Sequence, residues 1–214
     1  TTALQQAINE ARAAWIKKKE SGYAPVGSVS DEKSDEENEM ETPTSKGKAS
    51  DLTVPLPMLA HDYNKRGHNI EWPCYVQPKL DGTRCLGIPG KGLFSRLRKA
   101  YPHLEHIVEE VNRFPAHWIL DGELYSDTLS FQEIVGLVKK ETLSAADQEK
   151  QRQIKFHVYD LILDEIPFRT RYVNLGVRMK QLQPQHMVLV KTESCASDYV
   201  MKEKHAEYTA EGYE

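Results

Sequence analysis

The stretch "YVQPKLDGTRC", Tyr75–Cys85, ends a short extended run with a lysine, which is followed at once by an Asp-Gly dipeptide and then by an arginine. Asp-Gly between two runs of strand-forming residues indicates a tight turn. Such a turn requires neither Lys79 nor Arg84. Because the turn would bring both side chains back towards the same opening, the stretch predicts a functional site as well as a local fold.

A lysine amine can attack phosphorus only in its uncharged form. A free lysine has a pKa of ~10.4, so about one in a thousand is neutral near pH 7. Burial, a neighbouring cation or a bound metal lowers such a pKa and makes the amine a usable nucleophile. Asp81 could orient the amine or help to hold a metal, and Arg84 could bind an anionic oxygen in bidentate fashion. These residues predict a covalent site on Lys79, with an exposed hairpin of scattered charges as the alternative.

Strand and helix patterns continue on both sides of this stretch. We expect strands at 74–80, 83–88, 117–125 and 155–163. The third is interrupted by a second Asp-Gly, and the last is apolar on both faces and therefore a buried central strand. We expect helices at 103–114, 130–140 and 171–182, and a last helix that starts after Ser197 and ends before Gly212. Ser130 and Glu133 form a capping-box pattern. Hairpin-like strands mixed with separated helices predict an α+β fold with antiparallel sheets and flanking helices.

Composition divides the 214 residues into three parts. Residues 1–20 carry an amphipathic helical pattern, and residues 21–51 are rich in Gly, Pro, Ser, Thr and acids, which predicts a flexible acidic linker. Residues 52–214 form the expected folded domain. The formal net charge is -4, but the run 31–41 alone holds seven acids and one lysine. The remainder is mildly basic, so net charge neither indicates nor excludes a DNA partner.

The cysteines and the apolar runs limit the cellular setting. Three cysteines, an odd number without C-x-x-C spacing, predict reduced thiols in an intracellular protein rather than a disulfide frame or a zinc site. No apolar run is long enough to cross a bilayer, and no signal-peptide pattern opens the chain, so we expect no membrane partner.

Four further motifs connect the lysine stretch to a known family. "KLDGTR" resembles the nucleotidyl-acceptor motif of the covalent nucleotidyltransferases, which include ATP-dependent DNA ligases, RNA ligases and mRNA capping enzymes. The other motifs follow in the family's order: "SRLRK" (95–99), "LDGELY" (120–125), "FHVYDLI" (156–162) and "EGYE" (211–214). The run "DGELYSDTLSFQEIVGLVKK" most resembles ATP-dependent DNA ligases of viral and phage type. The resemblance implies that residues 52–214 are part of a nucleotidyltransferase (adenylation) domain.

The resemblance also implies a reaction and the residues that bind its nucleotide. Lys79 would attack ATP and become adenylylated, Gln77 would meet the adenine edge, and Tyr159 would stack on adenine. Arg84 and Glu123 would contact the AMP ribose or the nick. AMP would then pass to the 5′-phosphate of nicked double-stranded DNA before the nick is sealed, in DNA replication, repair or recombination.

Metal and phosphate roles follow from the same resemblance. Arg96 would grip the 5′-phosphate at the nick. Glu123 and Glu214 would be the main carboxylates linked to Mg²⁺, with Asp81 as a further ligand, because a hard divalent cation prefers carboxylate oxygens. The two residues that follow Arg96, Leu and Arg, are bulky for a tight turn, which leaves the geometry of that turn open.

The family pattern extends beyond the residues of this sequence. In the family, a Lys-x-Lys motif and an oligonucleotide-binding (OB) barrel follow the "EGYE" motif, so we expect a domain truncated before the OB domain, with a C-terminal remainder as its partner. Residues 1–20 weakly resemble the end of a WGR-type module. Two alternatives stay open: an RNA ligase or mRNA capping guanylyltransferase, and a truncated, non-catalytic DNA-binding fragment.

Overall fold

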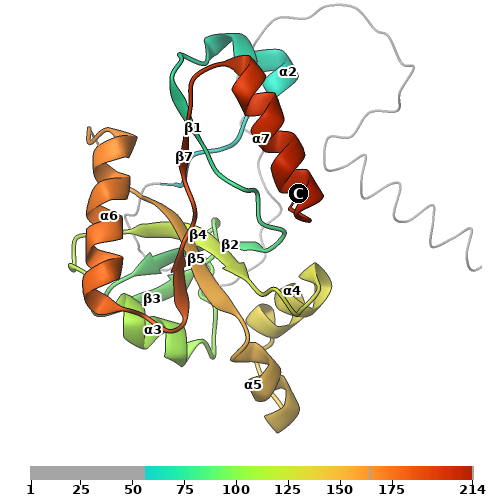
Figure 1. Cartoon of the computed structure of the whole chain (residues 1–214). Helices are drawn as coiled ribbons and strands as arrows, with labels where there is room; N and C mark the ends of the chain where they lie inside the picture. The colour runs from blue at the N-terminus through green and yellow to red at the C-terminus, as the bar shows by residue number, and fades with distance from the viewer. Residues whose placement is uncertain (1–55, 164, 214) are drawn as a thin grey trace, which may run out of the picture. The chain divides into compact units, whose positions relative to one another are not determined.

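A computed structural model describes residues 56–163 and 165–213 of the chain, all within one compact unit (Figure 1). The expected helix at 1–20, the expected linker at 21–51 and Glu214 lie outside the described residues. The described residues form a mixed arrangement of helices and two sheets, which confirms the predicted α+β class.

The larger sheet has five strands in the order β3-β2-β4-β5-β6. Three of its four strand pairs are antiparallel, and β5 and β6 pair in parallel. Its strands are β2 (Thr83–Ile88), β3 (Gly92–Phe94), β4 (Leu120–Tyr125), β5 (Lys155–Leu161) and β6 (Met187–Leu189). Strand β4 is the middle strand, and β5 is an internal strand between β4 and β6. The prediction that β5 is buried on both faces holds only in part, because His157, Tyr159 and Asp160 are half-buried.

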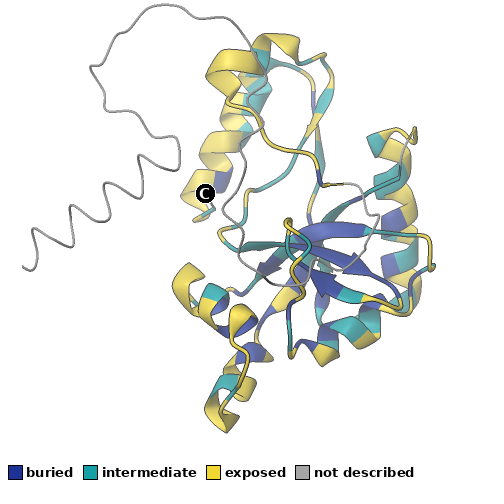
Figure 2. Cartoon of the chain, turned by 180° about the vertical axis from the view of Figure 1, so that it is seen from behind, coloured by how far each residue is buried: buried dark blue, intermediate teal, exposed yellow. Residues whose placement is uncertain are grey.

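Helices pack on one face of this sheet. They are α3 (Glu105–Val111), α4 (Phe131–Lys139) and α6 (Phe168–Leu182), and α5 (Ala145–Gln151) follows α4. Their buried apolar side chains join those of the strands in one cluster, seen as the dark blue centre of Figure 2. Fully buried members of this cluster include Ile107, Ile134, Leu175, Leu124 and Phe156. Because strand side chains alternate between the two faces of a sheet, the remaining residues of these strands lie on the face that points away from the helices.

The second sheet pairs segments from the two ends of the described chain. Strand β1 (Cys74–Val76) runs antiparallel to β7 (Glu193–Cys195). It is accompanied by α2 (Tyr63–Arg66), the 3₁₀ helix η1 (Gly67–Asn69) and α7 (Asp198–Ala210), and Figure 1 shows β1 and β7 side by side. The expectation of a hairpin at the first Asp-Gly was wrong, because β1 and β2 belong to different sheets and the dipeptide joins them.

The helix boundaries test the capping predictions. The predicted capping box at Ser130 and Glu133 is present at the start of α4. Ser197 caps α7 by accepting a hydrogen bond from the backbone N–H of Val200, and this helix ends before Gly212, as expected. The helix expected at 171–182 begins three residues earlier, after Pro167. Within the described residues no helix has the length and apolar character that crossing a bilayer requires.

Both Asp-Gly glycines lie against the backbone of a neighbouring strand. A Cβ on Gly82 would stand 2.4 Å from the carbonyl oxygen of Leu124, and a Cβ on Gly122 would stand 2.3 Å from that of His157. Gly122 lies inside a continuous β4, so the second Asp-Gly does not interrupt that strand. These glycines are therefore required by close approach of two backbones rather than by turn geometry.

We predict that Gly122→Ala destabilises the chain by about 3 kcal/mol, because the new Cβ would force β4 and β5 apart. Gly136→Ala is the matched control, since nothing lies within 4 Å of its Cβ position on α4. This control should gain up to ~1 kcal/mol from the better helix propensity of alanine. Urea unfolding of both variants measures the difference, and a Gly122→Ala curve as stable as that of Gly136→Ala would contradict the close approach.

Candidate active site

A shift in the pairing of β4 with β5 positions two neighbouring side chains for a site. Gly122 pairs with Val158 but Asp121 pairs with Asp160, so Tyr159 has no register partner on β4. Val158 and Leu161 on either side point into the core. Such a bulge re-aims side chains locally, and both residues between them, Tyr159 and Asp160, line the same cavity.

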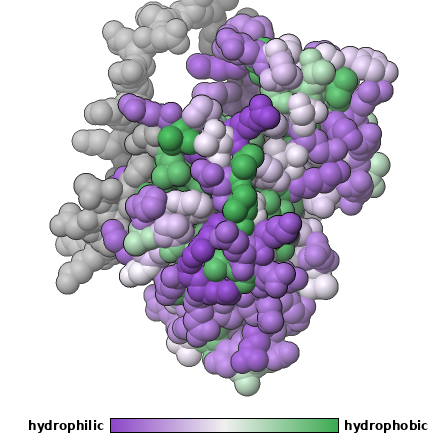
Figure 3. Space-filling view, turned by 60° about the vertical axis from the view of Figure 1, so that its left-hand side comes forward, coloured by the Kyte–Doolittle hydropathy of each residue, from purple (hydrophilic) through white to green (hydrophobic). Residues whose placement is uncertain are grey.

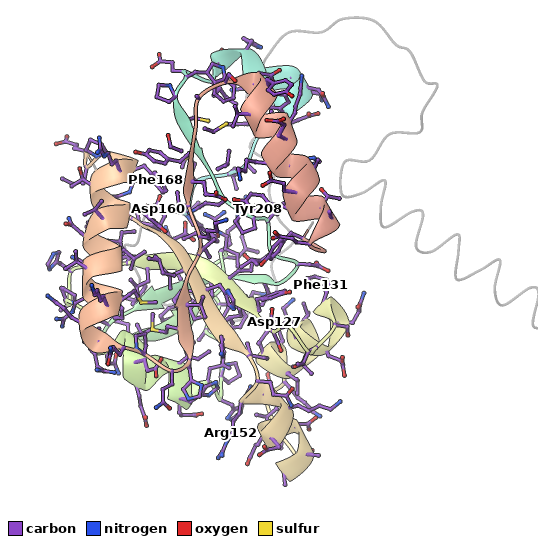
Figure 4. All side chains as sticks on the ribbon, in the orientation of Figure 1. Asp127, Phe131, Arg152, Asp160, Phe168 and Tyr208 are labelled. Carbon is purple, nitrogen blue, oxygen red and sulfur yellow. The ribbon has the colours of Figure 1, made fainter. Side chains whose placement is uncertain are left out.

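This cavity has a volume of about 590 Å³ and takes its walls from both sheets. Its volume is in the usual range of small-molecule sites, which are mostly apolar with a few placed polar groups. The walls come from residues around β1, β2, β4, β5 and α6, together with the segment before α2: Met58–Ala60, Glu71, Pro73–Tyr75, Gln77, Arg84, Asp121, Tyr159, Asp160, Phe168 and Arg171. Figure 4 shows two of them, Asp160 and Phe168, close together where α6 begins.

Arg84 is held in the wall by a bidentate ion pair with Asp121. Its Nε lies 3.0 Å from Oδ1 and its Nη2 lies 2.6 Å from Oδ2, and its Nη1 donates to the carbonyl of Met58 at 2.9 Å. The Asp121 side chain is only 6% exposed. Burial raises the pKa of Asp121, and the Arg84 guanidinium opposes that shift. Desolvation lowers the pKa of Arg84, but the hydrogen bond and charge of Asp121 outweigh it and raise the pKa overall.

A second bidentate pair lies beside the first. Arg171 on α6 donates from Nε to Asp160 Oδ1 at 2.8 Å and from Nη2 to Oδ2 at 2.7 Å, with both side chains 16% exposed. The guanidinium stands 5.7 Å from the centre of the Phe168 ring, a cation–π contact. The hydrogen bond to Asp160 raises the pKa of Arg171. This pair fixes α6 to the bulged end of β5.

Tyr159 and Gln77 were predicted to contact adenine, and both line the cavity. The Arg84 guanidinium lies 5.5 Å from the centre of the Tyr159 ring. Burial, followed by the charge of Asp121, raises the pKa of Tyr159, so its phenol is neutral at physiological pH. Gln77 donates from Nε2 to the Tyr159 carbonyl at 3.1 Å and to Thr192 Oγ1 at 2.8 Å. The amide is thereby oriented against the bulge.

Arg84 also borders a second cavity, of about 500 Å³, on which Arg96 lies. Two lysines, Lys99 and Lys139, add to its positive lining. The turn whose geometry the sequence left open is tight: the Ser95 N–H donates to the Lys99 carbonyl at 2.7 Å, and the Ser95 Oγ accepts from the Lys99 N–H at 3.1 Å. Within this turn Arg98 takes a left-handed conformation, with φ of 61°, and the Leu97 side chain is exposed.

The remaining predicted residues lie outside the lining of the first cavity. Lys79 and Asp81 are exposed on the segment that joins β1 to β2, and neither lines the first cavity. Glu123 is half-buried on β4 and is the register partner of Arg84. The structure thus brings Gln77, Arg84 and Tyr159 together.

The described carboxylates do not cluster into a metal centre. Among residues 56–163 and 165–213, no group of three or more His, Cys, Asp or Glu side chains is arranged to hold a metal ion. Mg²⁺ typically uses one or two carboxylates and completes its shell with water and phosphate oxygens.

Among the wall residues that sequence reasoning missed are Asp121, Phe168 and Arg171. Asp121 was predicted only as part of an interrupted strand. Because it is an acidic residue two positions before Glu123, the sequence already placed it on the same strand face as Glu123. Arg171 was expected at the first position of a helix, and no local pattern connects it with Asp160. Their pairing depends on how α6 packs against β5.

We predict that Arg171→Ala lowers the free energy of unfolding by about 2–3 kcal/mol, because it leaves the half-buried Asp160 carboxylate without its ionic partner. Lys202→Ala is the matched control: it breaks an ion pair with Asp198 in which both side chains are well exposed, at 65% and 45%, and it should change stability far less than Arg171→Ala. Urea unfolding measures both. Equal losses in the two variants would show that the Arg171 pair adds nothing.

Solved structures of DNA ligases resemble this arrangement. A Lig E DNA ligase matches with a TM-score of 0.61 and 21% identity, over 75% of this chain and 60% of its own. The Chlorella virus DNA ligase-adenylate matches with a TM-score of 0.53 and 14% identity, over 69% of this chain and 54% of its own. The ATP-dependent DNA ligase from bacteriophage T7, in complex with ATP, matches with a TM-score of 0.53 and 16% identity, over 71% and 57%.

No protein-family profile matches the chain, and no curated protein matches it significantly. The chain spans about 60% of the length of the Lig E ligase and just over half that of the two viral enzymes. The resemblance inferred from the five motifs is thus supported independently by the course of the backbone. The described part of this chain has the nucleotidyltransferase-domain fold of the ATP-dependent DNA ligases.

Proposed function

We propose that this chain is the adenylation domain of an ATP-dependent DNA ligase and that Lys79 carries AMP during the reaction. The uncharged Lys79 amine attacks the α-phosphorus of ATP. An N–P bond forms, the bond to the β-phosphate oxygen breaks, pyrophosphate leaves, and the amine proton passes to solvent. In the complete enzyme AMP then moves to the 5′-phosphate of nicked double-stranded DNA, and the 3′-hydroxyl displaces it to seal the strand.

The first cavity is the proposed nucleoside site. It holds the Tyr159 ring, on which a purine can stack, and the Gln77 amide, which can meet a base edge. The solved relatives point the same way, since the T7 ligase was determined with ATP and the Chlorella virus ligase as an adenylate. The observation that carries the proposal is that three residues predicted from two separate stretches, Gln77 and Arg84 from the first and Tyr159 from the other, line one cavity of nucleoside size.

The position of Lys79 is compatible with delivery to this cavity. Gln77, two residues before it, and Arg84, five residues after it, both line the wall. The exposed lysine therefore stands on a short segment whose two ends are fixed at the cavity. A rotation of this long side chain, or a small movement of the segment, would bring the amine to a bound triphosphate.

Mg²⁺ is the proposed companion of ATP. Asp81 and Glu123 are the described carboxylates that would hold it, and Glu214 is the third predicted ligand, outside the described residues. The ion would neutralise phosphate charge as pyrophosphate leaves.

The second cavity is the proposed phosphate site for DNA. It contains Arg96, Lys99, Lys139 and one side of Arg84, a concentration of cations that suits a 5′-phosphate and its neighbours along the backbone. The Lig E relative is described as binding DNA with a minimal scaffold. We infer backbone contacts that depend little on sequence and weaken with salt. Replication, repair and recombination are the processes that require such sealing.

The full ligase reaction requires parts that we expect beyond this sequence. These are the Lys-x-Lys motif, whose lysines would hold phosphates, and the OB domain, which would close over the substrate. We propose the same division for this chain as in the sequence prediction: a helix and an acidic linker before residue 52, and the adenylation domain from there on.

We predict that the chain incubated with α-³²P-ATP and Mg²⁺ gains a label that survives denaturation, and that Lys79→Ala abolishes it. Lys91→Ala, at an exposed lysine in the turn between β2 and β3, is the control and should label normally. A label from α-³²P-GTP alone would instead indicate capping or a related guanylyl transfer. Absence of label with both nucleotides, also in a chain extended through the expected Lys-x-Lys motif and OB domain, would leave a DNA-binding fragment.

We predict that Arg96→Ala weakens binding to a nicked duplex with a 5′-phosphate by about tenfold and lowers the slope of log affinity against log salt by about one. Binding to the same nick with a 5′-hydroxyl should hardly change. Arg152→Ala, at an exposed arginine outside both cavities, is the control. Fluorescence anisotropy at several salt concentrations measures these values, and equal losses on both duplexes would refute a specific phosphate contact.

A further inference from the structure

Two of the three cysteines face each other across the small sheet. Cys74 on β1 is the register partner of Cys195 on β7. Directly opposed residues of antiparallel strands have Cα atoms about 4.5–5.5 Å apart, and a disulfide requires a Cα separation of about 4.4–6.8 Å. The backbone therefore presents this pair at a separation that a disulfide can bridge without strand movement. Both thiols are free in this structure.

The two thiols differ in their access to solvent. Cys195 is fully buried and its Sγ–H donates to the carbonyl of Ser197 at 3.3 Å, whereas Cys74 is half-buried and also lines the 590 Å³ cavity. Burial raises the pKa of Cys74. The charge of Cys195 and its hydrogen bond with Cys74 raise this pKa further. The pair thus consists of one thiol that a small reagent can reach through the cavity and one that only its neighbour can reach.

We propose that Cys74 and Cys195 form a reversible dithiol–disulfide pair that is oxidised by small disulfides such as glutathione disulfide. The inference is independent of the proposed function. In a reducing compartment both residues remain thiols, in agreement with the cysteine pattern of the sequence. A more oxidising glutathione pool would link them.

The exchange proceeds in two balanced steps. The Cys74 thiolate attacks one sulfur of glutathione disulfide, whose S–S bond breaks and releases one glutathione thiolate. Cys195 then loses its proton and attacks the Cys74 sulfur of this mixed disulfide, which forms the Cys74–Cys195 bond and releases the second glutathione thiolate. Two protein thiols are oxidised, one glutathione disulfide is reduced, and the two protons pass to the released thiolates.

The link would act on the wall of the cavity. Strand β1 leads directly into Gln77 and the Lys79 segment, and β7 leads into α7. A covalent bond across the strands would hold β1 to β7 and so fix this side of the cavity. Cys85 offers an internal control, because it is as fully buried as Cys195 but lies on β2 in the other sheet.

The test exposes the native chain to glutathione disulfide, quenches with acid, unfolds the chain and labels remaining thiols with a maleimide. We expect loss of two of the three thiols, a proteolytic peptide pair joined through Cys74 and Cys195, and full recovery with dithiothreitol. Cys85→Ser should form the same link, whereas Cys74→Ser and Cys195→Ser should not. Because the Cys74 pKa is raised, the rate should increase about tenfold from pH 7 to pH 8.

Several results would overturn the pair. Stable glutathione adducts on Cys74 without a joined peptide would show that Cys195 cannot attack it. A link that forms only in urea, or a link that includes Cys85, would show that the folded chain does not present these two thiols to each other. A loss of ATP labelling alone would not bear on the pair, since the peptide map reads the link directly.

Discussion

Two carboxylates stand opposite each other on neighbouring strands, and much of the site depends on how their charge is compensated. Asp121 on β4 and Asp160 on β5 are register partners, and the charge of Asp160 raises the pKa of Asp121. Two like charges in a poorly hydrated wall destabilise each other. Each is balanced by its own arginine through two parallel hydrogen bonds, one from β2 and one from α6. These pairs tie four elements, β2, β4, β5 and α6, to the edge of one cavity.

The ion pair of Arg84 with Asp121 lies between the two cavities. Arg84 faces both cavities, so the guanidinium that balances Asp121 also forms part of the boundary between the proposed nucleoside and DNA-phosphate sites. On the face shown in Figure 3, apolar surface is confined to a few patches between hydrophilic side chains. Under the proposed function, this arrangement would hold base and phosphate in adjacent compartments with a shared cation between them.

Local patterns predicted the parts of this molecule that local physics determines. The capping box of α4, the Ser197 cap of α7 and the apolar run of β5 each reflect interactions within a few residues. The cavity residues Gln77, Arg84 and Tyr159 were found because motif order carried information that spacing alone lacks. The shape of the exposed Lys79 segment was not predictable, because the sheet to which β1 belongs is decided elsewhere in the chain.

The long-range pairs were missed for a related reason. The partner of Asp160 lies on a helix whose start is set by Pro167 and by packing, and no periodicity in the sequence records that contact. The first Asp-Gly was predicted as a turn and the second as an interruption of a strand, although Gly82 and Gly122 are needed where backbones nearly touch. The sequence alone does not distinguish a glycine required by a turn from a glycine required by the close approach of two backbones. Only the position of the neighbouring strand distinguishes the two cases.

The pairing of β1 with β7 has a consequence for the order of folding. It joins residues about 120 positions apart, whereas β2 pairs with β3 across a short turn, and such distant pairings form slowly because a long loop must close first. We expect the five-stranded sheet to assemble before the two-stranded one. Because β1 lines the cavity and pairs with β7, the ribosome must release β7 before this wall of the cavity is complete. A nascent chain would therefore contain the two arginines and the two carboxylates of the wall before it could retain a ligand.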